Sequence, residues 1–228
     1  MSRCAIAIAI ALVCAGLVAC SSTPPPPDWQ MNAKSSLERA TSAFLSGNSR
    51  IEAVEFARVR ADLARTGRPD LLARAELARC AARVASLEFD DCPGYLAVER
   101  DAAAPERAYA NYLRGTLAAS DAALLPEPQR AALAGNPAAD SLARIADPLS
   151  RLVAAGVLLR SGKGDPAAFA LATDTASAQG WSRPLLAWLN MRAQRADAAG
   201  ELEEAARLRR RIRLVLDTGA PAAPRAAN

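Results

Sequence analysis

Apolar positions in this chain recur at helical spacing, in segments separated by glycine and proline. Three stripes are clearest: Leu149, Leu152, Val153, Gly156 and Leu159; then Leu185, Trp188, Leu189, Ala193 and Ala196; then Leu202, Ala205, Leu208, Ile212, Val215 and Leu216. Steps of three and four residues put such side chains on one face of an α-helix, whereas a half-buried strand needs strict alternation. The chain has no long β-branched alternation, and it is rich in strong helix formers such as alanine, leucine and arginine. The sequence therefore predicts an all-α fold.

Start and stop signals divide the chain into helices of ordinary length. Starts are predicted by a capping residue or a first-turn proline, at Asp28, at a Ser49–Glu52 capping box, and at Pro69, Pro93, Pro105, Asn136-Pro137, Asp147-Pro148 and Asp165-Pro166. Stops are predicted by glycine, at Gly47, Gly67, Gly162, Gly180 and Gly200. We expect the first helix to run to about Leu45 and the third to about Leu87, with a break at 126–128 and a close neighbour packed against Gly156.

The second half of this helical region, 29–217, has a repeating length. Residues 147–180 and 182–217 span 34 and 36 residues and each holds two predicted helices. A period of this size is typical of stacked antiparallel helix hairpins. Residues 200–205 resemble the turn and second-helix start of a tetratricopeptide repeat, and residues 187–191 resemble its first helix, one residue out of register. The fold is thus either a short TPR-like solenoid or an irregular helical bundle.

The first twenty residues carry the most specific motif of the chain. Arg3 gives a basic start, residues 5–18 are uncharged and mostly apolar, and Leu17-Val18-Ala19-Cys20 ends the run. The run is shorter than the roughly 18 apolar residues of a membrane span but suits a secretory signal. The motif resembles the lipobox of bacterial lipoproteins, in which the cysteine is acylated. This resemblance implies that residues 1–19 are a cleaved signal peptide and that Cys20 is the lipidation site.

The resemblance also predicts where the protein lies. Ser21 follows the cysteine, and the absence of an Asp retention signal there implies sorting to the outer membrane of a Gram-negative cell, with the body facing the periplasm. At least two acyl chains are needed for stable attachment. Residues 20–28 form a proline-rich tether, in which Pro24–Pro27 favour a stiff polyproline II rod. Residues 218–228 are rich in alanine and proline, and we expect a disordered tail.

Two cysteines remain once the leader and Cys20 are set aside. Cys80 and Cys92 form an even pair in an oxidising compartment, with Asp90-Asp91 offering a turn between them. A helix from Cys80 and a short return stretch can bring the two sulfurs together. We therefore expect a disulfide, with two free and partly buried thiols as the alternative. The spacing is not that of a redox-catalytic Cys-x-x-Cys pair.

Candidate catalytic chemistry is sparse. The chain has no histidine, which excludes histidine triads, histidine bases and histidine metal ligands. No phosphate-binding loop, dinucleotide fingerprint or Gly-x-Ser-x-Gly motif occurs, and no carboxylate pair stands out by its spacing. The net charge of +4 is too small to indicate nucleic-acid binding. We expect a protein that is not an enzyme, with no cofactor and no metal.

Candidate partner-binding residues lie near the end of the chain. The last predicted helix begins with Glu201, Glu203 and Glu204 and continues with Arg207, Arg209, Arg210, Arg211 and Arg213, an order that suits the helix dipole and sets up a Glu203–Arg207 pair. The arginines form either a solvated face or a docking patch for an anionic partner, and Arg209 lies at the edge of the apolar arc. Trp181 and Trp188, like Tyr109 and Tyr112, belong either to the core or to an exposed binding surface.

Three functional hypotheses follow from these observations. The first is a lipid-anchored periplasmic interaction scaffold that docks an envelope protein, since stacked helix hairpins form extended grooves. The second is a structural envelope lipoprotein with no specific client. The third is a periplasmic enzyme that uses carboxylates alone, for which the sequence offers no candidate set. An exposed groove lined by Trp, Tyr or Leu would favour the first, and a uniformly polar surface the second.

Overall fold

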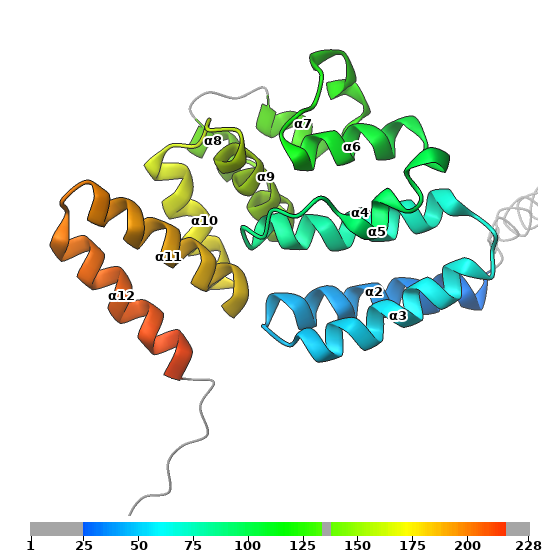
Figure 1. Cartoon of the computed structure of the whole chain (residues 1–228), viewed down its shortest axis with the longest axis horizontal. Helices are drawn as coiled ribbons and strands as arrows, with labels where there is room; N and C mark the ends of the chain where they lie inside the picture. Colours follow the sequence, from blue (N-terminus) through cyan, green and yellow to red (C-terminus); the bar gives the residue numbers. More distant parts are fainter. Residues whose placement is uncertain (1–24, 134–137, 218–228) are drawn as a thin grey trace, which may run out of the picture.

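A computed structural model of the chain describes residues 25–133 and 138–217, and all regular secondary structure within them is helical (Figure 1). The α-helices are α2 (Asp28–Leu45), α3 (Ser49–Ala64), α4 (Pro69–Ala85), α5 (Pro93–Leu96), α6 (Ala104–Arg114), α7 (Glu127–Leu133), α8 (Ala138–Ala143), α9 (Pro148–Arg160), α10 (Pro166–Ala178), α11 (Ser182–Ala198) and α12 (Leu202–Asp217). Two 3₁₀ turns, η1 (Glu99–Asp101) and η2 (Ala119–Leu124), lie on either side of α6. The predicted all-α fold is confirmed, while the leader, Cys20, Asn136-Pro137 and the tail 218–228 lie outside the described residues.

Helix hairpins form both ends of the molecule (Figure 1). At one end α2 and α3 run antiparallel, and at the other end α11 and α12 do the same. Between them α4 packs against α9, and α9 and α10 form the hairpin predicted for residues 147–180. The shorter elements α5 to α8 cover one side of α4 and α9. The hairpins therefore follow one another in space in chain order, and the start of the last hairpin also meets the first, because α11 contacts α2.

Helix caps follow the predicted pattern with two corrections. Asp147 and Asp165 accept hydrogen bonds from the backbone N–H groups of Ser150 and Ala168, each at 2.7 Å, as expected of N-caps. Asp28 is not a cap, because Pro27 occupies that position and Asp28 begins α2. The Ser49–Glu52 capping box is also absent.

The second helix is capped one residue earlier than expected. The side chain of Asn48 accepts from the N–H of Ile51 at 3.1 Å, and Ser49 is already helical. The third helix ends at Ala85 and not at Leu87, which takes a left-handed backbone conformation. The five predicted glycine stops all have positive φ, which confirms that they end helices: Gly47, Gly67, Gly162, Gly180 and Gly200.

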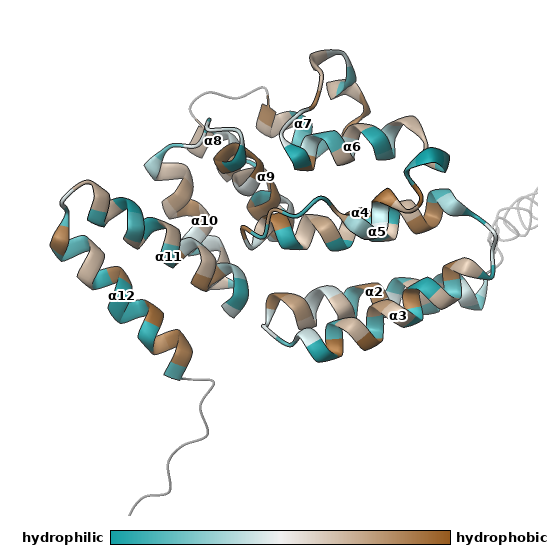
Figure 2. Ribbon diagram, viewed as in Figure 1, coloured by the Kyte–Doolittle hydropathy of each residue, from teal (hydrophilic) through white to brown (hydrophobic). Residues whose placement is uncertain are grey.

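The core centres on α4 and α9. Six consecutive residues of α9, from Leu152 to Val157, are buried, so this helix is surrounded on all sides, and Figure 2 shows it hydrophobic around most of its circumference. Gly156 lies against the end of α4, where an added Cβ would sit 2.4 Å from the Val84 carbonyl oxygen. The predicted close neighbour of Gly156 is therefore confirmed. The third stripe is correct in its middle, where Ala205 and Leu208 are buried and Ile212 and Val215 pack against the core, but Leu202 and Leu216 at its ends are exposed.

Buried carboxylates tie the first helices together. Four glutamates are buried, and each pairs with arginine: Glu52 with Arg79, Glu55 with Arg39 and Arg58, Glu76 with Arg60, and Glu106 with Arg74. A buried charge is tolerated only when a partner compensates for its lost hydration. These pairs therefore fix which faces of α2, α3, α4 and α6 meet. Among the helices of the described residues, none combines the length and apolar composition needed to cross a bilayer.

Candidate functional site

An apolar groove opens between the N-terminal hairpin and the rest of the molecule. It has a volume of about 500 Å³ and is lined by α2, α4, α6, α9 and the residue before α11: Leu37, Glu38, Thr41, Ser42, Leu45, Ala78, Ala81, Tyr109, Asp147, Leu149, Ser150, Val153 and Trp181. Most of these side chains are apolar, and Trp181, Tyr109 and Leu149 are only partly buried. A concave surface of this kind, with few polar groups at its edge, is what a binding site for an apolar or peptide ligand requires.

Both charged residues that line the groove are acidic, but one of them, Glu38, pairs with Lys34 one turn earlier on α2 at 3.9 Å. Glu38 and Asp147 are exposed at its edge, and no lysine or arginine among the described residues lines it. Burial raises the pKa of the Tyr109 phenol well above its usual value, and the nearby Asp147 carboxylate adds to the effect. Tyr109 thus stays neutral, and its ring presents an aromatic surface with a polar tip. The groove therefore combines an apolar, aromatic lining with an acidic edge.

Arg183 holds the start of α11, next to Trp181, against the end of α2. Its guanidinium donates to the Phe44 carbonyl at 2.7 Å, to the Glu88 carboxylate at 3.0 Å and to the Ser49 hydroxyl at 2.6 Å. It also lies over the Phe44 ring, 4.3 Å from the centroid. These contacts join α11 to the end of α2, next to the groove residues Leu45 and Trp181. No local signal in the sequence identifies this residue.

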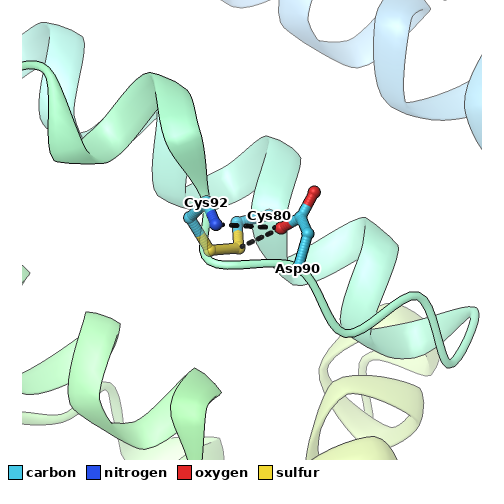
Figure 3. Close-up of side chains that lie close together, drawn as sticks. All are labelled: Cys80, Asp90 and Cys92. Atoms are coloured by element: carbon cyan, nitrogen blue, oxygen red, sulfur yellow. Dashed lines mark hydrogen bonds between the residues drawn. A yellow bond between two sulfur atoms is a disulfide. The ribbon is translucent and has the colours of Figure 1, made fainter.

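Cys80 and Cys92 lie together, as the sequence predicts. Their Cα atoms are 5.7 Å apart, their sulfurs are within bonding distance, and the turn between them carries Asp90 (Figure 3). The Asp90 carboxylate accepts from the Cys92 backbone N–H at 2.9 Å and lies 3.9 Å from the Cys80 sulfur. Three potential metal ligands thus converge here. Sulfurs that are bonded to each other offer no thiolate to a metal, so the arrangement suits a covalent link between α4 and α5.

The two candidate tryptophans have different environments. Trp188 is fully buried, and its indole Nε1 donates to the Ala85 carbonyl at 3.0 Å. It belongs to the core, and a role as an exposed binding anchor is wrong for this side chain. Trp181 lies at the groove and remains partly exposed. Of the predicted aromatic anchors, Trp181 and Tyr109 line the groove and are partly buried.

The arginines of α12 do not form one patch. Arg207 pairs with Glu204 at 2.6 Å, so the expected Glu203–Arg207 pair is wrong by one residue. Arg209 reaches across to Asp197 at the end of α11. Arg210 is exposed and Arg211 is half-buried. Two of the four candidate arginines are therefore engaged in bridges within the α11–α12 hairpin.

Comparison with known proteins adds no relative: no protein-family model, no curated protein and no solved structure matches this chain.

The groove itself was not predicted. Its residues come from five separate stretches of sequence, and only Trp181 and Tyr109 attract attention as isolated aromatics. Leu37 and Leu149 carry ordinary helical patterns, so periodicity alone cannot tell a groove wall from a buried face. A site formed by the meeting of distant helices leaves no local motif.

Proposed function

We propose that this protein is a lipid-anchored, periplasm-facing scaffold of the bacterial outer membrane, which docks a protein partner in the groove beside Trp181. The motif Leu17-Val18-Ala19-Cys20 supports the anchor and the compartment. The observation that carries the docking role is the groove, because the partly buried side chains of Trp181, Tyr109 and Leu149 all line it. A structural spacer has no need of such a surface.

The proposed role requires no catalysis. The edge of the groove carries two carboxylates, Glu38 and Asp147, and Asp147 already caps α9. Burial of a peptide segment in a space of about 500 Å³ would remove a few apolar side chains from water. Each fully buried side chain of this kind contributes roughly 1.5–3 kcal/mol. Affinity would come mainly from those contacts, with the carboxylates selecting a cationic segment.

Site-specific photocrosslinking in living cells tests the docking role. A photoreactive amino acid at Thr41, inside the groove, should give a discrete adduct with one envelope protein, and the same probe at Ala57, exposed on α3, should not. Ser42→Arg should abolish the Thr41 adduct, since Ser42 is exposed and lines the groove, whereas Ala57→Arg should leave it intact. The same adducts from both probe positions, unchanged by Ser42→Arg, would contradict the proposal.

A further inference from the structure

The chain contains a sequence whose chemistry matches the groove. Residues Pro221-Ala222-Ala223-Pro224-Arg225 follow α12. In a polyproline II conformation, which repeats every three residues, two prolines spaced in this way fall on one face. Pro-x-x-P segments bind aromatic-lined grooves because little conformational entropy is lost when they dock. The groove offers Trp181 and Tyr109 as such aromatic surfaces.

The hairpin topology brings this segment to the groove. α11 and α12 are antiparallel and both about 25 Å long, so α12 ends on the side where α11 begins (Figure 1). Trp181 immediately precedes α11. From Asp217 to Arg225 a polyproline II segment spans about 25 Å, and packed helices lie only about 8–10 Å apart. The length of the tail is therefore sufficient to reach the groove from the end of α12.

The charges are complementary as well. Arg225 is the single charged residue of 218–228. The groove has carboxylates at Glu38 and Asp147, and no basic residue of the described chain lines it, although Lys34 beside it pairs with Glu38 at 3.9 Å. The small side chains of the tail, mostly alanine, suit a shallow apolar surface. The length, the small side chains and the charge of residues 218–228 therefore all suit the groove.

We propose that residues 218–228 occupy the groove of their own chain, with Pro221 and Pro224 against Trp181 and Tyr109 and with Arg225 facing Glu38 and Asp147. The inference rests on the proposed function in that the tail would compete with the docked partner for the same surface. Tethering makes the competition effective, because a short linker holds the tail at a millimolar local concentration. A partner must then bind the groove more tightly than the tail does, through apolar and cationic side chains that fit the groove better than those of the tail.

The indole N–H signals of the protein test this proposal by NMR. The chain has three tryptophans: Trp29, Trp181 and Trp188. In the full mature chain carrying Cys20→Ser, deletion of 218–228 should shift the Trp181 signal and leave the buried Trp188 signal in place. A synthetic peptide of residues 218–228 added to the truncated chain should return the Trp181 signal toward its original position. Unchanged Trp181 signals in both experiments would overturn the proposal.

Charge variants and a block of the groove make the test specific. Arg225→Glu in the peptide should weaken its binding about two- to fivefold, the size expected for an exposed ion pair, and Glu38→Arg in the groove should recover it. Ser42→Arg should abolish binding of the peptide, and Ala57→Arg should not. Equal binding to the Ser42→Arg and Ala57→Arg proteins would overturn the assigned site. A shift of Trp181 that appears in the full chain only at high protein concentration would show docking between copies, and would overturn docking within one chain.

The two proposals fail separately. If the tail peptide does not bind but Thr41 gives a discrete adduct in cells, the tail proposal is wrong and the docking role stands. If the tail peptide binds but no adduct forms, even in cells that express the truncated chain, the docking role is wrong and the intramolecular contact stands.

Discussion

The indole Nε1 of Trp188 donates a hydrogen bond to the carbonyl oxygen of Ala85, at 3.0 Å. Ala85 is the last residue of α4, and the final carbonyls of a helix have no partner within the helix itself. A tryptophan more than a hundred residues later in the chain therefore satisfies one of them. This contact joins α11 to α4, in the region where Gly156 of α9 also lies against Val84.

Trp188→Phe should reduce stability more than its loss of volume suggests. The substitution leaves the Ala85 carbonyl buried without this donor, at a cost of about 1–3 kcal/mol. Urea denaturation followed by circular dichroism measures the loss in the free energy of unfolding. Trp181→Phe is the matched control, because Trp181 is partly exposed, and its effect should be smaller. Equal effects of the two substitutions would contradict this account.

Gly156→Ala should destabilise the protein although alanine is the better helix former. Helix propensity alone predicts a gain of about 1 kcal/mol from this exchange. The new Cβ would instead lie 2.4 Å from the Val84 carbonyl oxygen, so α4 and α9 must separate. Overpacking of this kind costs typically 1–3 kcal/mol. Thermal denaturation shows the sign directly, and a higher melting temperature would mean that the two helices are not in close contact.

Loss of the link between Cys80 and Cys92 should lower the free energy of unfolding by about 3 kcal/mol, the value expected for closing a loop of about a dozen residues. The comparison is between the native chain and Cys80→Ala/Cys92→Ala in urea, each with and without reductant. Reductant should affect only the native chain. Two thiols that alkylate fully in denatured protein without reductant would show that the bond is absent.

The tyrosines should make the protein sensitive to strong alkali. Burial raises the pKa of Tyr95, Tyr109 and Tyr112, and these are the three tyrosines of the chain. The folded state therefore keeps protons that the unfolded chain releases above about pH 10. The contribution of the neutral tyrosines to the free energy of unfolding is therefore complete below about pH 10 and falls as the pH rises above it.

Absorbance at 295 nm measures tyrosine ionisation in this range. It should rise together with the loss of helical circular dichroism above pH 10. Tyrosines that ionise near pH 10 in fully helical protein would contradict the assigned burial. Tyr95→Phe is a useful companion variant, because the Tyr95 hydroxyl is buried without a hydrogen-bond partner among the described residues. Its removal should leave the stability nearly unchanged.

Local rules were sufficient for much of the fold. Asp147 and Asp165 cap their helices as predicted, because an Asp side chain can accept from an unpaired first-turn N–H and the following proline suits the first helical position. Where two adjacent residues can both cap a helix, the sequence does not show which of them does so. Asn48 and Ser49 are equally suitable, and Asn48 is the cap in the structure. The proximity of Cys80 and Cys92 was predictable because the connection between them is short.

Contacts between distant segments were not predictable. The pattern around Gly156 indicates that a neighbour approaches closely, but nothing in it identifies Val84. The contact of Arg183 with Phe44 depends on how two hairpins dock, and its residues carry no local signature. Leu202 and Leu216 follow a helical stripe and yet are exposed, because α12 packs along one side only, against α11. The groove is a product of the same long-range packing.

The proposed function depends above all on attachment to the envelope through Cys20. Mass spectrometry of the N-terminal peptide, taken from protein purified out of the native cell membrane, measures this directly. The account predicts that residues 1–19 are absent and that Cys20 is the first residue, carrying diacylglycerol, while Cys20→Ala yields no such peptide. An N-terminal peptide that still begins at Met1, with an unmodified Cys20, would contradict it.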